Sequence, residues 1–173
     1  MKGRETLIGL IIGFVLTSSL SYYKANDFFT APKIDVFEVP TVDLNNTPVK
    51  ISEIPDKNLI VNIWATWCRP CIKEMPYLSS LRDRLDSENW QIILISDEEI
   101  DKIKSFKDKF KVDLELIKAQ EKLKDYGIKG YPTTYVINKD RVVEFSRNGE
   151  LLLFQTEFEN SLKKLDATFV SEQ

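Results

Sequence analysis

The chain contains no histidine among its 173 residues. Imidazole is the base in Ser-His-Asp and Cys-His catalytic arrangements, so the sequence excludes both. Zinc, copper and haem sites that depend on histidine are excluded for the same reason. Cysteine is scarce too, because Cys68 and Cys71 are the only two in the chain. Any redox or soft-metal chemistry must therefore use this one pair.

An excess of basic residues is also lacking. The 24 Lys and Arg stand against 27 Asp and Glu, which gives a net charge of −3. Residues 1–24 hold three basic residues and one acidic residue, so the rest of the chain carries −5. Phosphate binding requires clustered Lys and Arg, and no basic patch stands out in the sequence. We therefore expect no nucleic-acid partner.

The N-terminus holds a long apolar run, from Leu7 to Leu16, behind Lys2 and Arg4. A secretory signal has this form, and the small residues around Ser19 and Ser21 could be its cleavage site. An uncleaved anchor over residues 6–23 is the favoured alternative, since 18 helical residues span roughly 27 Å of a bilayer core of about 30 Å. A buried core helix would leave the basic start unexplained. Both favoured interpretations place the domain outside the cytoplasm.

The chain length fits one domain with an appendage. We expect a signal or anchor over residues 1–23, a linker over 24–35, a folded domain over 36–167 and a tail over 168–173. No cysteine precedes Cys68, so an N-terminal lipid-modified cysteine is excluded.

Apolar runs and their periodicity predict strands and helices in alternation. The predicted strands are Val36–Val39, Val49–Ile51, Leu59–Trp64, Trp90–Ile95, Asp113–Ile117, Thr133–Ile137 and Val142–Phe145. The predicted helices are 69–85 with a kink at Pro76, Glu98–Phe110, Glu121–Tyr126 and Leu151–Leu165. Asp97, Glu98 and Glu99 are expected to be a solvated helix start. The pattern indicates an α/β fold with a mixed sheet between helices.

The segment from Trp64 to Cys71, WATWCRPC, lies where a predicted buried strand ends and a helix begins. The free amides and the dipole of a helix N-terminus favour a negative charge there, so Cys68 is placed to form a thiolate. Cys71 follows one turn later, within reach of a mixed disulfide on Cys68. Pro70 stiffens the helix start without costing a hydrogen bond. The spacing predicts a redox-active pair.

Two other interpretations of the Cys68–Cys71 pair stay open. Half a zinc knuckle would need two more cysteine or histidine ligands, which only a second copy of the chain could supply. An inert structural disulfide would gain little, because so short a loop constrains the unfolded chain weakly. The strand before the pair, the amphipathic helix after it and the neighbouring Trp67 favour the redox interpretation.

The segment WATWCRPC resembles the active site of thioredoxin-like proteins, and the wider pattern resembles the TlpA/ResA-type membrane-anchored thiol-disulfide oxidoreductases. The resemblance covers residues 36–165 and also rests on residues 74–76 and 126–134. It implies a thioredoxin fold, with a mixed central sheet flanked by helices on both faces and an N-terminal hairpin extension. It also implies a cis peptide before Pro132, with Tyr131 preceding it. From the sequence alone, a trans proline at the start of an edge strand is equally compatible.

The resemblance assigns roles to further residues. Thioredoxin carries an aspartate six residues before the first cysteine, where this chain has the non-titrating Asn62. TlpA/ResA-type proteins carry a glutamate three residues after the second cysteine, and Glu74 matches it. Glu74 would accept the proton of Cys71, although an exposed first-turn glutamate favoured by the helix dipole is the alternative. The expected substrate-binding residues are Trp67, Arg69, Pro70, Tyr131 and Pro132.

The expected activity is thiol-disulfide exchange by the catalytic residues Cys68, Cys71 and Glu74, with no cofactor and no metal. The expected partners are exported proteins with cysteine pairs, a membrane thiol electron donor upstream, and the membrane itself through the N-terminal segment. By resemblance, the direction is reduction, and apocytochrome c is one substrate. Two alternatives are a thiol peroxidase on the same fold and a non-enzymatic redox or metal adaptor. Copper-binding adaptors of this kind would need a histidine, which the chain lacks.

Overall fold

The computed structural model describes residues 2–29, 31–54 and 56–169 and divides the chain into two units, Met1–Thr30 and Ala31–Gln173. The first unit is one helix, α1 (Lys2–Phe29), whose side chains are described over residues 8–22 and at residue 29. Among the described residues, no helix is both long and apolar enough to cross a membrane. The predicted anchor over residues 6–23 is therefore not confirmed, and residues 6, 7 and 23 fall outside the described side chains.

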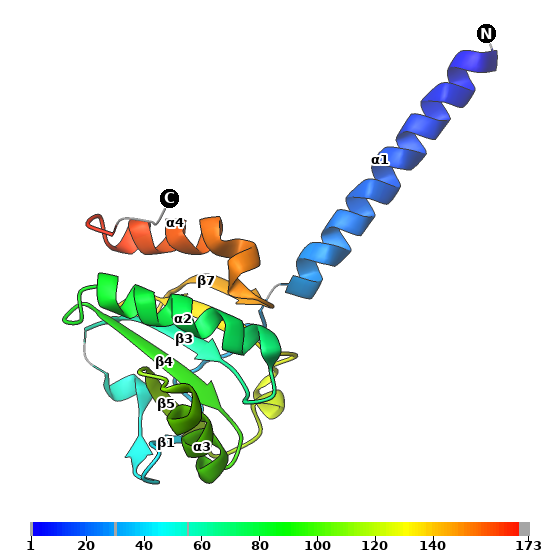
Figure 1. Cartoon of the computed structure of the whole chain (residues 1–173). Coiled ribbons are helices and arrows are strands. Elements are labelled where there is room, and N and C mark those ends of the chain that lie inside the picture. Colours follow the sequence, from blue (N-terminus) through cyan, green and yellow to red (C-terminus); the bar gives the residue numbers. More distant parts are fainter. Residues whose placement is uncertain (1, 30, 55, 170–173) are drawn as a thin grey trace. The chain divides into compact units, whose positions relative to one another are not determined.

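The second unit is built on a seven-stranded sheet in the order β2-β1-β5-β4-β3-β6-β7 (Figure 1). Its strands are β1 (Thr41–Val42), β2 (Pro48–Val49), β3 (Asn58–Ile63), β4 (Trp90–Ser96), β5 (Glu115–Ala119), β6 (Thr133–Ile137) and β7 (Val143–Asn148). The central strands β3, β4 and β5 pair in parallel, and every other pairing is antiparallel. The predicted mixed sheet is confirmed.

Three α-helices cover one face of the sheet: α2 (Arg69–Arg84), α3 (Ile100–Phe110) and α4 (Gln155–Leu165). Two consecutive crossovers, β3-α2-β4 and β4-α3-β5, advance in the same direction across the sheet. Because such crossovers share one hand, they place α2 and α3 on the same face. Tyr77 of α2 meets Phe158 of α4 edge to face, at 6.3 Å between ring centroids. One continuous core joins the helices to this face.

The opposite face is covered by residues 31–39 and by two 3-10 helices, η1 (Ile51–Glu53) and η2 (Leu123–Tyr126). Val36 and Val39 are buried here, but they lie in a turn rather than in a strand. The predicted strand Val36–Val39 is therefore wrong, because both valines pack into the core without pairing to a neighbouring strand. The predicted linker over residues 24–35 stays a prediction; α1 ends at Phe29, and Ala31 is already buried in the second core.

The predicted N-terminal hairpin is present, with strands displaced from their expected places. Thr41 pairs with Val49 and Val42 with Pro48, so the turn lies at residues 43–47, and Pro48 of the predicted turn 45–48 belongs to β2 instead. The Asp43 carboxylate accepts hydrogen bonds from the backbone N–H groups of Asn45 and Thr47, both at 2.8 Å. Such a side-chain bond to nearby amides is how aspartate stabilises a turn. The hairpin extends the sheet by pairing β1 with the edge of β5.

Two elements, α3 and β5, begin two residues later in the chain than the sequence predicts. The helix predicted from Glu98 begins at Ile100, so Asp97 and Glu98 belong to the loop after β4. The strand predicted over Asp113–Ile117 is β5, two residues later. The loops after β3 and β4 lie at the same end of the sheet, because these strands are parallel. The cysteine pair lies at that end.

Candidate active site

Cys68 and Cys71 form a disulfide at the start of α2, with their Sγ atoms 2.04 Å apart. Cys68 is the N-cap residue, in extended backbone conformation, and its Sγ accepts a hydrogen bond from the Cys71 N–H at 3.3 Å. Pro70 occupies the first turn, where a missing N–H costs nothing. The strand–cysteine–helix placement predicted for the pair is confirmed.

The two cysteines differ in their access to solvent. Cys68 keeps 4% of its surface exposed, whereas Cys71 keeps none. Trp67, immediately before the pair, is 64% exposed, and Arg69 is exposed as well. Cys68 is therefore the more accessible of the two sulfurs.

The loop before β6 lies beside this surface. The peptide bond between Tyr131 and Pro132 is cis, as the resemblance implied. The Tyr131 ring meets the Trp67 ring edge to face, with centroids 5.5 Å apart. The Pro132 carbonyl accepts a hydrogen bond from the Gly149 N–H at 2.8 Å, which ties the loop to the end of β7. The loop with Tyr131 and Pro132 therefore lies beside Trp67, the residue directly before Cys68.

Glu74 lies one helical turn after Cys71 and is fully buried. Its Oε1 accepts a hydrogen bond from Asn62 Nδ2 at 2.7 Å, and its Oε2 accepts one from the Leu151 N–H at 2.9 Å. Asn62 Nδ2 also donates to Thr134 Oγ1 at 3.0 Å. The exposed first-turn glutamate considered from the sequence is therefore ruled out.

The surroundings of Glu74 change its acidity. Burial raises the pKa of Glu74 to about 7, although the hydrogen bonds from Leu151 and Asn62 act in the opposite direction. The negative charge of Glu150 adds to the rise. Desolvation penalises the charged form because a carboxylate away from water loses its hydration. Glu74 therefore gains and loses its proton near neutral pH.

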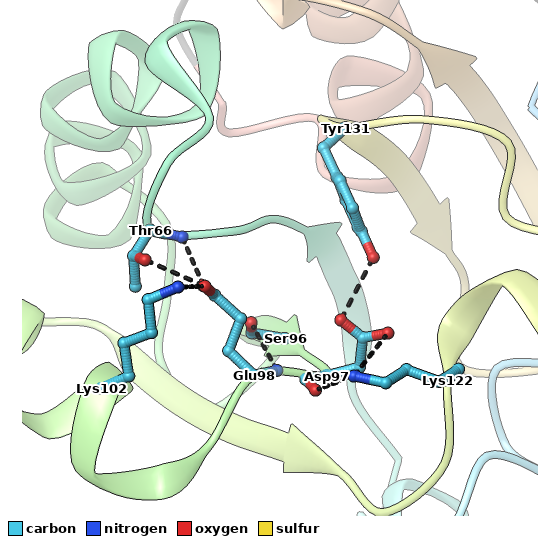
Figure 2. A network of polar contacts seen from close by, with 7 residues as sticks. All are labelled: Thr66, Ser96, Asp97, Glu98, Lys102, Lys122 and Tyr131. Carbon is cyan, nitrogen blue, oxygen red and sulfur yellow. Dashed lines mark hydrogen bonds and ion pairs between the residues drawn. The ribbon is translucent and has the colours of Figure 1, made fainter.

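A second group of carboxylates, Asp97 and Glu98, contacts Thr66 and Tyr131 (Figure 2). Glu98 Oε2 accepts from the Thr66 N–H at 2.5 Å, and Oε1 accepts from Thr66 Oγ1 at 3.0 Å. Lys102 also donates to Glu98 Oε1. Tyr131 donates its hydroxyl proton to Asp97 Oδ1 at 3.3 Å. The expectation of a solvated helix start is wrong for Asp97 and Glu98, whose side chains are only 14% and 10% exposed, and holds for Glu99 alone.

Charge and hydrogen bonding fix the state of Glu98. Burial acts to raise its pKa, but the hydrogen bonds from Lys102 and Thr66 outweigh it and leave the pKa below its ordinary value. Burial and the nearby Asp97 carboxylate raise the pKa of the Tyr131 hydroxyl. Glu98 is therefore charged and Tyr131 is protonated throughout the neutral range. No local sequence pattern distinguished Asp97 and Glu98 from an ordinary surface run, because Thr66 and Tyr131 are distant in the sequence.

Among the side chains that the structure describes, no group of three or more Cys, Asp or Glu residues could hold a metal ion.

Comparisons with known proteins agree with this geometry. The AhpC/TSA family model matches residues 30–146. The thiol-disulfide oxidoreductase ResA of Bacillus thuringiensis subsp. konkukian (strain 97-27) is 30% identical over 173 residues, covering 95% of this chain and 99% of the relative. ResA of Bacillus subtilis (strain 168) is 26% identical over 147 residues, covering 80% of this chain and 82% of the relative.

Solved structures share the fold. A thiol:disulfide interchange protein DsbE from Chlorobium tepidum gives a TM-score of 0.65 at 19% identity, covering 78% of this chain and 97% of the other. StoA from Bacillus subtilis gives 0.56 at 19% identity, covering 70% and 97%. These likenesses confirm the predicted thioredoxin fold. The family match shows that the chain belongs to the AhpC/TSA family of thioredoxin-like proteins, and the relatives named ResA identify it as a thiol-disulfide oxidoreductase.

Proposed function

We propose that this protein is an extracytoplasmic reductant that opens disulfides in other exported proteins. The observation that carries the proposal is the arrangement of the pair: a slightly exposed Cys68 caps α2, and a fully buried Cys71 and Glu74 lie behind it. This order separates the sulfur that meets the substrate from the sulfur and the carboxylate that finish the reaction.

In the first step, the reduced enzyme attacks through Cys68. The thiolate displaces one sulfur of the substrate disulfide and forms a mixed disulfide, and the released substrate sulfur takes up a proton. The N–H groups at the start of α2 stabilise the thiolate before the attack, as the Cys71 N–H bond to Sγ illustrates. Trp67, Arg69, Pro70, Tyr131 and Pro132 form the surface that holds the substrate segment.

In the second step, Cys71 attacks Cys68 and the mixed disulfide opens. The Cys71 thiol must lose its proton, and Glu74, one turn away on α2, accepts it. A carboxylate with a pKa of about 7 suits this role because it is half ionised at the pH of the reaction. The substrate leaves with two electrons and two protons more, and the enzyme holds the Cys68–Cys71 disulfide.

A partner must then return two electrons to the enzyme, and a membrane thiol donor is proposed for this role. The N-terminal unit is proposed to be a signal or anchor that places the domain outside the cytoplasm. Support comes from the relatives named ResA and from a solved structural neighbour, a protein of Mycobacterium tuberculosis described as a secreted disulfide oxidoreductase. The proposed substrates include the cysteine pair of apocytochrome c.

The direction of transfer is tested with a peptide that carries the Cys-x-x-Cys-His sequence in disulfide form. The prereduced protein, freed of reductant, should reduce the peptide and become oxidised itself, while a Cys68→Ser variant should do neither. Equilibrium titration of wild type should give a reduction potential below that of the peptide. A potential above it would overturn the reductant assignment.

The location is tested in intact cells with a maleimide that does not cross membranes. After reduction with a membrane-impermeant phosphine, Cys68 should be labelled from outside in the full-length chain. Labelling only after the cells are broken open would contradict an extracytoplasmic domain.

The thiol peroxidase and the metal adaptor are not favoured. The similar curated relatives are named thiol-disulfide oxidoreductases. Turnover of hydrogen peroxide faster than of protein disulfides would reverse this preference.

A further inference from the structure

Two loops form the surface around Cys68, and one short segment contacts both. The first loop carries Thr66 and Trp67 into α2, and the second carries Tyr131 into β6. Asp97 and Glu98, the two residues directly after β4, contact one of these loops each (Figure 2). The end of a buried central strand is a rigid support, so both loops are tied to the same fixed point.

We propose that Asp97 and Glu98 are positioning residues that set the spacing of the two loops and thereby the affinity for protein disulfides. Glu98 fixes the first loop through two acceptor bonds to Thr66, at 2.5 and 3.0 Å. Asp97 fixes the second loop through the Tyr131 hydroxyl at 3.3 Å. The rings that these loops carry, Trp67 and Tyr131, lie 5.5 Å apart and form the two sides of the surface.

The surroundings hold both carboxylates in place. Lys102 of α3 pairs with Glu98, and Lys122 lies 4.0 Å from Asp97 Oδ2. The Leu123 N–H donates to the same Asp97 oxygen at 3.2 Å. Two mostly buried carboxylates need such partners, because an unpaired charge out of water is costly. Each carboxylate therefore has one orientation, in which it contacts its own loop.

The inference concerns substrate binding rather than the sulfur chemistry. In the proposed mechanism, neither carboxylate moves a proton to or from Cys68 or Cys71, and each acts through a residue that borders the sulfur pair. A protein substrate contacts Trp67 and Tyr131 together, whereas a small disulfide needs only the Cys68 sulfur. Loss of the positioning bonds should therefore raise KM for protein substrates and leave the reaction with small disulfides unchanged. This expectation rests on the proposed docking of substrates beside these two rings.

The test uses the full-length protein with insulin as the protein disulfide and dithiothreitol as the electron source, after subtraction of the uncatalysed rate. Tyr131→Phe keeps the ring and removes only the hydroxyl. Glu98→Gln keeps one acceptor oxygen, and Glu98→Ala keeps none. We expect KM for insulin to rise about fivefold in Tyr131→Phe, which corresponds to one hydrogen bond of ordinary strength. The rise should be larger in Glu98→Ala than in Glu98→Gln, and kcat should stay within about twofold.

Two matched controls make the same chemical changes elsewhere. Tyr126→Phe removes a hydroxyl that donates to Glu121 Oε2 at 2.7 Å, and Glu144→Gln neutralises a carboxylate that pairs with Lys164. Both controls should keep the wild-type KM. After reduction, the Glu98 variants and both controls should react with 5,5′-dithiobis(2-nitrobenzoate) at the wild-type rate.

The double variant Tyr131→Phe with Glu98→Ala tests the shared spacing. The rise in its KM should be smaller than the product of the rises in the two single variants, because both bonds support one geometry. If the effects on KM were independent of each other, the two loops would not share one spacing, which would contradict the inference. An unchanged KM in Tyr131→Phe would overturn it as well. A parallel loss with insulin and with the small disulfide would mark a merely structural role and overturn it too. If wild type itself reduced no insulin, the proposed function would be at fault instead.

Discussion

Glu74 and Glu98 both contact residues near the cysteine pair, and Glu98 has a cation among its partners where Glu74 has neutral donors. This difference decides their chemistry. Glu74 lies behind the disulfide among apolar side chains, with the neutral donors Asn62 and Leu151 on its two oxygens. Glu98 contacts the loop that leads into α2, with Lys102 as an ion-pair partner and Thr66 as a double donor. Burial raises the pKa of Glu74 to about 7, whereas the donors around Glu98 leave its pKa below the ordinary value.

The comparison shows how one side-chain type performs two tasks. Neutral donors only partly offset the cost of burying a carboxylate, so Glu74 takes up a proton near neutral pH. A cation supplies the missing compensation, so Glu98 keeps its charge and its hydrogen bonds. The first group is suited to proton transfer, and the second is suited to holding a loop.

The largest expected effect is on the pH dependence of stability. The pKa of Glu74 is about 7 in the folded protein, and an unfolded chain titrates near 4.5. The folded state therefore binds the proton more tightly, and this stabilisation is present at low pH and lost as pH rises through 7. The stability of wild type relative to Glu74→Gln should fall by about 3 kcal/mol between pH 4 and pH 8.

Urea unfolding across this pH range measures the effect. Gln is a close mimic of the protonated carboxyl, because its oxygen can keep the Leu151 bond while its amide pairs with a reoriented Asn62. Glu144→Gln makes the same change at another mostly buried carboxylate and is the control for the substitution itself. A wild-type curve parallel to that of Glu74→Gln would show that Glu74 titrates normally, and the contrast between the two glutamates would disappear.

The next effect is on the rate of the second chemical step. Without a proton acceptor, resolution of the mixed disulfide by Cys71 should slow about 100-fold in Glu74→Gln at pH 7. Attack of Cys68 on the substrate should be unchanged, since that step needs no proton from Cys71. Rapid-mixing kinetics with a fluorescent mixed disulfide on Cys68 separate the two steps. Equal slowing of both would point to a distorted site rather than to a lost base.

The sequence was informative where the determining interactions are local. The strand before Cys68, the helix after it and the turn near Asn46 follow from periodicity and turn chemistry within a few residues. The cis peptide before Pro132 came from the resemblance, because proline alone is compatible with either isomer. These features could be predicted because their causes lie in the same short segment.

The environments of the carboxylates could not be predicted in this way. Glu74 is buried because Asn62 and Leu151, 12 and 77 residues away, close around it. Glu98 resembles any surface charge until the fold brings Thr66 to it from 32 residues away. A segment such as Val36–Val39 shows the converse error, since apolar residues can fill a core without forming a strand. Burial depends on what covers a residue, and that information is distributed along the chain.

A smaller effect is expected when Glu98 itself loses its charge. Glu98→Gln should cost about 1–2 kcal/mol of stability, because two charge-assisted hydrogen bonds are weakened. Since the lowered pKa keeps Glu98 ionised at neutral pH, the cost should be the same at pH 6 and pH 8. Urea unfolding at these two values gives the comparison, with Glu144→Gln as the control. A cost that differed between them would mean that Glu98 also titrates, which would break the contrast with Glu74.

The smallest effect is expected from removing the cation alone. Lys102 is 56% exposed, so solvent screens its pairing with Glu98, and Lys102→Met should cost less than about 1 kcal/mol at pH 7. A carboxylate with a lowered pKa stabilises the fold above its unfolded pKa and loses that contribution as pH falls. The difference between wild type and Lys102→Met should therefore be present at pH 7 and absent near pH 3. Added salt at pH 7 should also shrink it. A large cost that salt did not reduce would show that Lys102 contributes by packing rather than by charge, and neutral donors would then account for the low pKa of Glu98.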